Sequence, residues 1–342
     1  MDLLPSEEQI QIASVVADFL RDQMPINAIR QRRSESTAVD ASTWARCGEL
    51  GWFGLGLPEV DGGVGYGLAE EVLLFRELGR QLAPGPFVSS VLGARVAARA
   101  GADDIAAAIV AGTVSVGLAE ARGHGCSVGA TVSGSFDLLD APGSTYLLVY
   151  GPDAVALVET AAIGTAQSVP CVDPAVRLAR VDLDAVASRV IVTDGPDQIV
   201  RRGSALVAAM LTGIAEATRD MSSEYAKVRV QFGRPIGVNQ AIKHACADMA
   251  LRADAASAQL LFAALSVDEG RSDAAFQVAA ARIVATDAAI ENATRTIQVH
   301  GGMGYTFEHD AHLFLKRARV LDRVLGDSRS QMAALIDLPA AQ

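Results

Sequence analysis

The sequence predicts an α+β protein in which a small β-domain lies between two helical domains. Apolar residues recur near the helical period of 3.6 toward both ends of the 342-residue chain, and the period changes to two in the middle. Half of the residues are hydrophobic and only 5% are aromatic, with alanine prominent, which is typical of packed helices rather than of a β-sandwich. We expect three domains, over residues 1–112, 113–196 and 197–342.

The first domain is expected to consist of helices joined by a glycine-rich break. Ser6 precedes an amphipathic stretch with acidic residues in its first turn, which is typical of a helix N-terminus. A further helix is expected over "LAEEVLLFRELGRQL". The break before it contains Gly62, Gly63 and Gly65, which look like a phosphate loop. No strand or P-loop lysine accompanies them, so turn formation explains these glycines better.

The middle region is predicted to be a β-domain of roughly six to eight strands. Between Thr113 and Asp194, short segments rich in valine and leucine alternate with glycine, proline, aspartate and serine. The expected strands lie in "TVSVGLAE", "SVGATVSGSFDLL", "YLLVYG", "AVALVET" and "RLARVDLD".

The C-terminal region is predicted to be an antiparallel bundle of four helices followed by a short terminal helix. The first two helices are expected over residues 204–229 and 240–268. Asp273 is the expected N-cap of a third helix that ends near Val299, where Gly301 and Gly302 stop it. The fourth helix is expected over residues 307–324.

Charge and cysteine usage exclude several classes of protein. The net charge is -11 and no Lys/Arg cluster has the density of a nucleic-acid or anionic-membrane surface. No apolar run approaches the roughly 18 residues of a membrane span, and the acidic N-terminus lacks the order of a signal peptide. The four cysteines are widely spaced, which suits neither a zinc site nor a disulfide framework. We therefore expect a cytoplasmic protein with no nucleic-acid or membrane partner.

Two segments of the bundle carry the most specific pattern: "YAKVRVQFGRPIGVNQAIKHACADM", from Tyr225 to Met249, and "QVHGGMGYTFEHD", which begins at Gln298. In the first, Phe232-Gly233 and Pro235 are expected to form a turn between two long helices. The guanidinium of Arg229 then either pairs with the oxygens of a diphosphate or lies in solvent at a helix end, and spacing alone does not decide between them.

The second segment is expected to let a ligand approach the backbone. Gly301, Gly302 and Gly304 present no Cβ, and Gln298 offers an amide beside the gap. A helix C-cap alone needs one glycine, so three glycines at this spacing favour close approach of a ligand.

Both segments resemble the acyl-CoA dehydrogenase family. The first follows the family pattern YxxxRxxFGxPIxxxQ and its ending LADM, with Cys246 in place of the leucine, and the second is similar to QxxGGxGYxxE. The N-terminal "GELGWFGLGLPEVDGGVGYG" is also similar to the family, so the resemblance covers essentially the whole chain. It implies the family fold, FAD as the cofactor, an acyl-CoA substrate and an electron-transfer flavoprotein or similar acceptor.

The resemblance also implies roles for individual residues. The family arginine that matches Arg229 contacts the FAD diphosphate of a neighbouring subunit, and the phenylalanine that matches Phe232 lies toward the adenine. The loop that matches Gly301-Gly302, with Gln298 at its edge, lies against the same diphosphate across the dimer interface. Gln240 is either a helix-start residue or a flavin contact.

The catalytic carboxylate is missing from both positions that the family uses. Oxidation of an acyl-CoA requires a carboxylate to remove the α-proton while the β-hydrogen leaves as hydride to flavin N5. Counted without gaps from Tyr305, the glutamate of the family motif EGT falls on Leu325, and the alternative position on the first bundle helix falls on Gly203. Asp327 is a displaced candidate, and a misplacement of about 1 Å can lower a rate about 100-fold.

The β-domain lacks the family motifs that contact the flavin ring. "TEPxxGSD" is replaced by "AEARGHGCS", in which only Glu120 remains, and "WITN" is absent. This pattern resembles the base-less chain of actinobacterial acyl-CoA dehydrogenases that act on steroid-derived CoA thioesters and pair with a Glu-bearing homologue as α2β2 heterotetramers. The alternative is a structural or binding subunit without flavin chemistry.

A metal site is not expected. His309 and His312, with Glu308, have a spacing that could face a metal, but no third convergent ligand is evident in the sequence.

Overall fold

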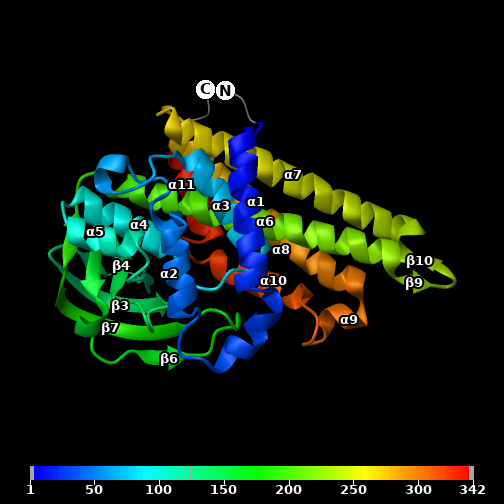
Figure 1. The fold of residues 1–342 in the computed structure, drawn as a ribbon, viewed down its shortest axis with the longest axis horizontal. Coiled ribbons are helices and arrows are strands. Elements are labelled where there is room, and N and C mark those ends of the chain that lie inside the picture. The colour runs from blue at the N-terminus through cyan, green and yellow to red at the C-terminus, as the bar shows by residue number, and fades with distance from the viewer. Residues whose placement is uncertain (1–3, 124, 339–342) are drawn as a thin grey trace. The chain divides into compact units, whose positions relative to one another are not determined.

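The computed structural model describes residues 4–123 and 125–338 and has the predicted order of a helical region, a β-sheet and a second helical region (Figure 1). Its contacts divide the chain into two compact units. The sheet unit comprises Ala28–Gly67 and Pro84–Gly203. The helical unit comprises Met1–Asn27, Leu68–Ala83 and Ser204–Gln342. Each unit is described separately below.

The sheet unit contains one eight-stranded sheet with the order β6-β7-β3-β1-β4-β5-β8, and β2 pairs with β3. The parallel pair is β1 with β4, and the other pairs are antiparallel. The strands are β1 (Val116–Ala121), β2 (Ser127–Val128), β3 (Thr131–Leu139), β4 (Tyr146–Tyr150), β5 (Val155–Glu159), β6 (Gln167–Val169), β7 (Leu178–Ala187) and β8 (Val190–Val192). The predicted strand number is therefore confirmed, although β6 and β8 were not anticipated.

Helices α2 (Ala41–Glu49), α4 (Phe87–Arg99) and α5 (Asp103–Val110) complete the sheet unit. Apolar side chains that alternate along the strands, such as Phe136, Leu138 and Val149, form the core of the sheet. α4 is anchored to β1 by hydrogen bonds, since Ser89 Oγ donates to the Val116 carbonyl and the Val116 N–H donates to Ser90 Oγ.

The helical unit is built from α1 and α3 together with the C-terminal bundle. Its elements are α1 (Glu7–Gln23), α3 (Leu68–Arg80), α6 (Pro196–Val228), α7 (Gln240–Asp268), α8 (Ala274–His300), α9 (Gly302–Tyr305), α10 (Ala311–Leu321) and α11 (Ser328–Asp337), and α6 enters this unit at Ser204. The predicted helix start after Ser6 is confirmed, because Ser6 and Gln9 form a reciprocal capping box.

Two predicted helix bounds were wrong. α6 begins at Pro196 rather than Ser204, because proline suits the first position of a helix, where its missing N–H would have no partner. α10 is shorter than expected. The prediction that Asp273 is the N-cap residue of α8 is confirmed, although its carboxylate accepts from Arg271 and from Gln277 and forms no side-chain capping bond.

Small side chains and one amide hold the bundle together. Cβ atoms added to Gly79 on α3 and Gly213 on α6 would lie 2.0 Å from the carbonyl oxygens of Met210 and Arg76, so these helices touch backbone to backbone. The buried Asn292 of α8 donates from Nδ2 to carbonyls of both α6 and α7. Three helices therefore meet at one polar contact.

By length and composition, α7 is the one described helix that could cross a membrane. The same test is passed by core helices of bundles, and a single such helix is weak evidence. α7 carries Asp254, which forms an ion pair with Arg219 of α6, and it buries Met249, Ala253 and Leu260. We interpret it as a bundle helix.

Candidate functional site

A hairpin projects from the bundle between α6 and α7. Its strands are β9 (Val230–Gln231) and β10 (Arg234–Pro235), and Phe232 and Gly233 form the connecting turn. Both turn residues have positive φ, 51° and 77°, as in the two-residue turns that favour hairpins. The predicted turn is therefore confirmed.

Two features of Phe232 in this turn are energetically unfavourable. Its side chain is 100% exposed, and its left-handed backbone conformation is unfavourable for a bulky residue. Asparagine or aspartate would suit the position better. Strained backbone conformations cluster at functional sites, and the exposed ring is available for a contact outside the chain.

Cations surround the hairpin. Residues 225–243 contain four Lys and Arg and no Asp or Glu, in a chain whose net charge is -11. Arg229 and Arg234 are exposed, and neither forms an ion pair within the part of the chain that the structure describes. An anion can therefore approach both guanidinium groups without displacing a carboxylate.

The predicted glycine loop follows the end of α8. Gly301 has a φ of 59°, and a Cβ built on Gly301 or Gly302 would meet nothing within 4 Å. The packing of this chain therefore does not require glycine at 302, and both positions are open to an approaching group. Gly304 differs, because its Cβ would lie 2.7 Å from the Ile297 carbonyl oxygen. The expectation that Gly304 also faces a ligand is wrong, since Gly304 is buried against its own chain.

The hairpin and the loop lie toward the same end of the bundle, where Figure 1 shows β9, β10 and α9. Tyr225, one turn before Arg229, stacks on His300, which directly precedes Gly301, with 4.1 Å between the ring centroids. Gln298 is exposed on the last turn of α8, and Gln240 is the exposed first residue of α7. Sequence reasoning missed Tyr225 and His300 because their contact joins residues far apart in the chain.

The features at this end of the bundle fit a dinucleotide. Two unpaired guanidinium groups suit a diphosphate, the open glycine backbone allows it to approach closely, and the exposed ring of Phe232 offers a stacking surface for a base.

The expected base position holds a buried leucine in a constrained turn. Leu325 is 3% exposed and has a φ of 57°. The fully buried Arg282 of α8 donates from Nη2 to the Leu321 and Val324 carbonyls, at 2.6 and 3.0 Å, and so fixes the segment. The other expected position, Gly203, is buried within α6. Neither position offers a carboxylate.

Asp327 is engaged as a helix cap. Its Oδ1 accepts from the Ser330 N–H and its Oδ2 accepts from Arg323 at 2.7 Å, so the carboxylate caps α11. The hydrogen bond from the Ser330 backbone, with that from the Ser330 hydroxyl, lowers the pKa of Asp327. A lower pKa makes a weaker base, and a structural role accounts for this residue.

Glu120, which is all that remains of the flavin-ring motif, also interacts within its own chain. Glu120 lies on β1 and accepts a hydrogen bond from the Tyr150 hydroxyl of β4. The metal alternative gains no support, because the described residues contain no group of three His, Cys, Asp or Glu able to hold a metal.

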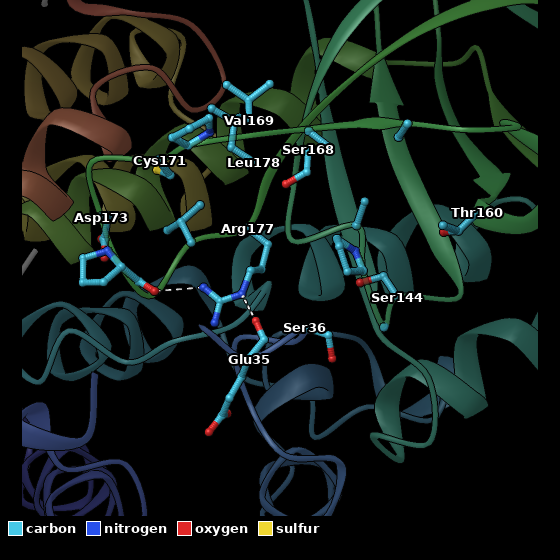
Figure 2. Close-up of a pocket in the computed structure, with 18 of the residues that line it drawn as sticks. Glu35, Ser36, Ser144, Thr160, Ser168, Val169, Cys171, Asp173, Arg177 and Leu178 are labelled. Carbon is cyan, nitrogen blue, oxygen red and sulfur yellow. Dashed lines mark hydrogen bonds between the residues drawn. The ribbon is translucent and has the colours of Figure 1, made fainter. Parts of the chain in front are cut away.

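The sheet unit contains a pocket of about 750 Å³ that the sequence did not indicate. Its aliphatic lining includes Ile163, Val169 and Leu178. Figure 2 shows Arg177 at its wall, where the guanidinium donates to the Glu35 and Pro174 carbonyls at 2.8 Å. The volume suits a small ligand, but none of the predicted cofactor residues lines this pocket.

Comparison with known proteins identifies the family of this chain. Residues 6–116 match the acyl-CoA dehydrogenase N-terminal domain and residues 199–337 match the acyl-CoA dehydrogenase C-terminal domain. The chain is 32% identical over 343 residues to acyl-CoA dehydrogenase IpdE2 of Mycobacterium tuberculosis (strain ATCC 25618 / H37Rv), covering 97% of this chain and 98% of that one. This chain belongs to the acyl-CoA dehydrogenase family.

Solved structures with the same fold include a two-component complex and a steroid ACAD variant. The ChsE4-ChsE5 complex from Mycobacterium tuberculosis has a TM-score of 0.88 and 25% identity, with 99% of this chain and 100% of that chain covered. A Tcur3481-Tcur3483 steroid ACAD variant also has a TM-score of 0.88 and 25% identity, with 97% of each chain covered. Acyl-CoA dehydrogenases use FAD. FAD is therefore the dinucleotide with which the residues at the cationic end of the bundle are compared.

Proposed function

We propose that this chain is a subunit of an FAD-dependent acyl-CoA dehydrogenase and completes the FAD site of a homologous, Glu-bearing partner. The observation that carries the proposal is the exposed end of the bundle. Among the described residues, the Arg229 side chain forms no ion pair, the Phe232 ring is fully exposed, and a Cβ on Gly301 or Gly302 would meet nothing within 4 Å. Such an arrangement is useful when the ligand is held jointly with a second subunit.

Each residue has a defined part in the proposed site. The Arg229 guanidinium binds the diphosphate through charge-assisted hydrogen bonds, and Gly301 and Gly302 admit the phosphate oxygens to the backbone. Phe232 covers the adenine side, Gln298 donates from its amide at the edge of the loop, and Gln240 contacts the flavin. FAD, when bound, supplies the hydride acceptor for α,β-dehydrogenation of an acyl-CoA.

The proton is removed by the partner in this proposal. Leu325 and Gly203 have no ionisable side chain, and Asp327 is committed to α11. The assembly we propose is an α2β2 heterotetramer that passes electrons to an electron-transfer flavoprotein or similar acceptor. A steroid side-chain CoA thioester is the proposed substrate, and the steroid ACAD variant among the structural relatives supports it. A cytoplasmic location is also proposed, supported by four free cysteines.

The test is co-expression with a Glu-bearing homologue, followed by flavin absorbance and turnover of a panel of CoA thioesters. We expect little or no turnover from this chain alone and turnover from the complex, which disappears when the glutamate of the partner is replaced. Ordinary turnover by the isolated chain, on the order of 1 to 1000 per second, would contradict the proposal.

The diphosphate contact is tested separately with Arg229→Ala in the complex. Loss of a hydrogen bond to a charged group corresponds to about 1.5 to 3 kcal/mol, or roughly 10- to 150-fold weaker FAD binding. Arg46→Ala, which removes an exposed arginine of the sheet unit, is the matched control and should leave FAD binding unchanged. Full flavin occupancy with Arg229→Ala would remove this arginine from the site.

The absence of the base and of the flavin-ring motifs also favours a second candidate, a structural subunit without flavin chemistry. The two differ in one result. A structural subunit would co-purify with its partner, and its Arg229→Ala variant would leave the flavin content of the complex unchanged.

A further inference from the structure

The two segments proposed to hold the diphosphate are distant in sequence, and a stack of three rings lies between them. Tyr225 is on the last part of α6, and the Arg229 N–H donates to its carbonyl at 2.9 Å. The Tyr225 ring stacks on His300 with an interplanar angle of 27°. His300 in turn packs against His309, with 4.5 Å between the ring centroids.

His300 is fixed at the end of α8 by burial and by a hydrogen bond. The side chain is 5% exposed, and its Nδ1 lies 2.8 Å from the Thr296 carbonyl oxygen. Because a carbonyl only accepts, Nδ1 carries the hydrogen. Burial lowers the pKa of His300, which favours the neutral form of the ring.

The glycine loop packs against His300 through Gly304. A Cβ on Gly304 would lie 2.8 Å from the His300 Cβ, and the Gly304 N–H donates to the Gly301 carbonyl at 3.0 Å. The loop therefore forms one tight turn that packs on His300. The open positions Gly301 and Gly302 lie on that turn.

Hydroxyl groups join the same two helices one turn below the stack. Ser222 Oγ of α6 donates to Thr296 Oγ1 of α8 at 3.0 Å, and Thr296 Oγ1 lies 3.0 Å from the Thr218 carbonyl oxygen. Thr296 also supplies the carbonyl that accepts from His300. The end of α8 is thus held to α6 at two successive levels, first by hydroxyls and then by rings.

We infer that His300 is a positioning residue which, through its stack with Tyr225, sets the Gly301-Gly302 backbone at the right separation from Arg229 for both to hold one diphosphate. This inference rests on the proposed function. His300 itself does not touch the cofactor, since it lies beneath the loop rather than at the open face.

The test uses the FAD-loaded complex with the Glu-bearing partner and compares His300→Leu with His300→Phe. An aromatic pair contributes enough that its loss should weaken FAD binding roughly three- to tenfold. We expect that loss with leucine, and recovery to within about twofold of the parent with phenylalanine, because phenylalanine keeps the ring. His312→Leu is the matched control, since the His312 ring packs on Phe307 and does not join the two segments.

Two further measurements separate positioning from a general loss of stability. The unfolding midpoint of the FAD-free complex is recorded for each variant, and positioning predicts that FAD affinity falls when this midpoint is unchanged. Tyr225→Leu breaks the same stack from α6, so the double variant with His300→Leu should bind FAD little more weakly than either single variant. Should His300→Leu fail to assemble, Tyr225→Leu and His300→Phe still provide the comparison.

The outcomes distinguish this inference from the proposed function. If His300→Leu and Tyr225→Leu retain parental FAD affinity while Arg229→Ala loses it, the positioning inference fails and the proposed function stands. Phenylalanine that binds FAD no better than leucine also contradicts positioning by the ring. If Arg229→Ala keeps full flavin as well, the proposed diphosphate site itself is wrong.

Discussion

At the scale of a single residue, the proposed role of Phe232 in binding FAD can be separated from its effect on stability. The residue combines full exposure with positive φ, so the folded chain gains little from its side chain. We predict that Phe232→Asn leaves the unfolding midpoint unchanged or raises it, by the equivalent of at most about 1 to 2 kcal/mol, while it weakens FAD retention by the complex. Thermal unfolding and flavin fluorescence measure the two effects. A clear loss of stability with full FAD binding would show that the ring serves the hairpin instead.

Asp327 offers a residue-scale test of a structural carboxylate. Asp327→Ala should destabilise α11 by about 1 kcal/mol, whereas Asp327→Asn, another good cap, should have little effect. Since the pKa of Asp327 is lowered by folding, its advantage over alanine is present above the unfolded pKa and disappears as the pH falls through the lower folded pKa.

Amide hydrogen exchange across Ser328–Asp337 measures this local stability. Turnover by the complex with Asp327→Asn should remain nearly intact. A large loss of turnover with that variant, at unchanged exchange, would make Asp327 a base.

Leu325 tests whether the missing base can be restored. Leu325→Glu places a carboxyl group at a buried site with positive φ, where an unpaired charge is strongly unfavourable. In a complex whose partner lacks its own glutamate, we predict no recovery of turnover and a lower unfolding midpoint. Recovery of even a few per cent of the parental rate would mean that this chain builds a complete flavin site.

Site residues that form a local motif could be predicted, and those that depend on tertiary contact could not. Arg229, Phe232 and Gly301 stand in continuous patterns, so the sequence placed them at a turn and at a helix end. Tyr225 and His300 are recognisable as partners only after α6 and α8 have packed. In the sequence, Gly304 cannot be distinguished from Gly301 and Gly302, yet in the fold it packs against His300.

At the scale of elements, the contact between α3 and α6 depends on two glycines. A methyl group on Gly213 would lie 2.0 Å from the Arg76 carbonyl oxygen, and backbone atoms cannot shift aside without an energetic cost. We predict that Gly213→Ala lowers the free energy of unfolding by about 1 to 3 kcal/mol. Gly129→Ala is the control, since its Cβ would meet nothing closer than 3.8 Å. Equal unfolding midpoints for the two variants would contradict the close contact.

Long elements followed from the hydrophobic period, whereas short elements and boundaries did not. α7 and α8 repeat apolar positions over many turns, which makes them visible in the sequence. β6 and β8 contain three residues each, too few for an alternation to be read, and they exist because neighbouring strands offer hydrogen-bond partners. The start of α6 was missed because Pro196 was not read as a first helical residue.

At the scale of the whole molecule, the chain presents groups suited to binding but has no carboxylate at the expected base positions. It displays cations, open glycines and an exposed ring at one end of the helical unit, and neither expected base position carries a carboxylate. We propose that a chain with these properties contributes a binding half, and that a second, homologous chain supplies the catalytic half.

The flavin stoichiometry of the purified complex tests this requirement most directly. If this chain only completes the site of its partner, an α2β2 assembly has two complete sites, and we predict about two FAD molecules for every four chains. The measurement combines flavin absorbance after denaturation with the mass of the intact assembly. About four FAD molecules per assembly, or stoichiometric FAD in the isolated chain, would contradict the account.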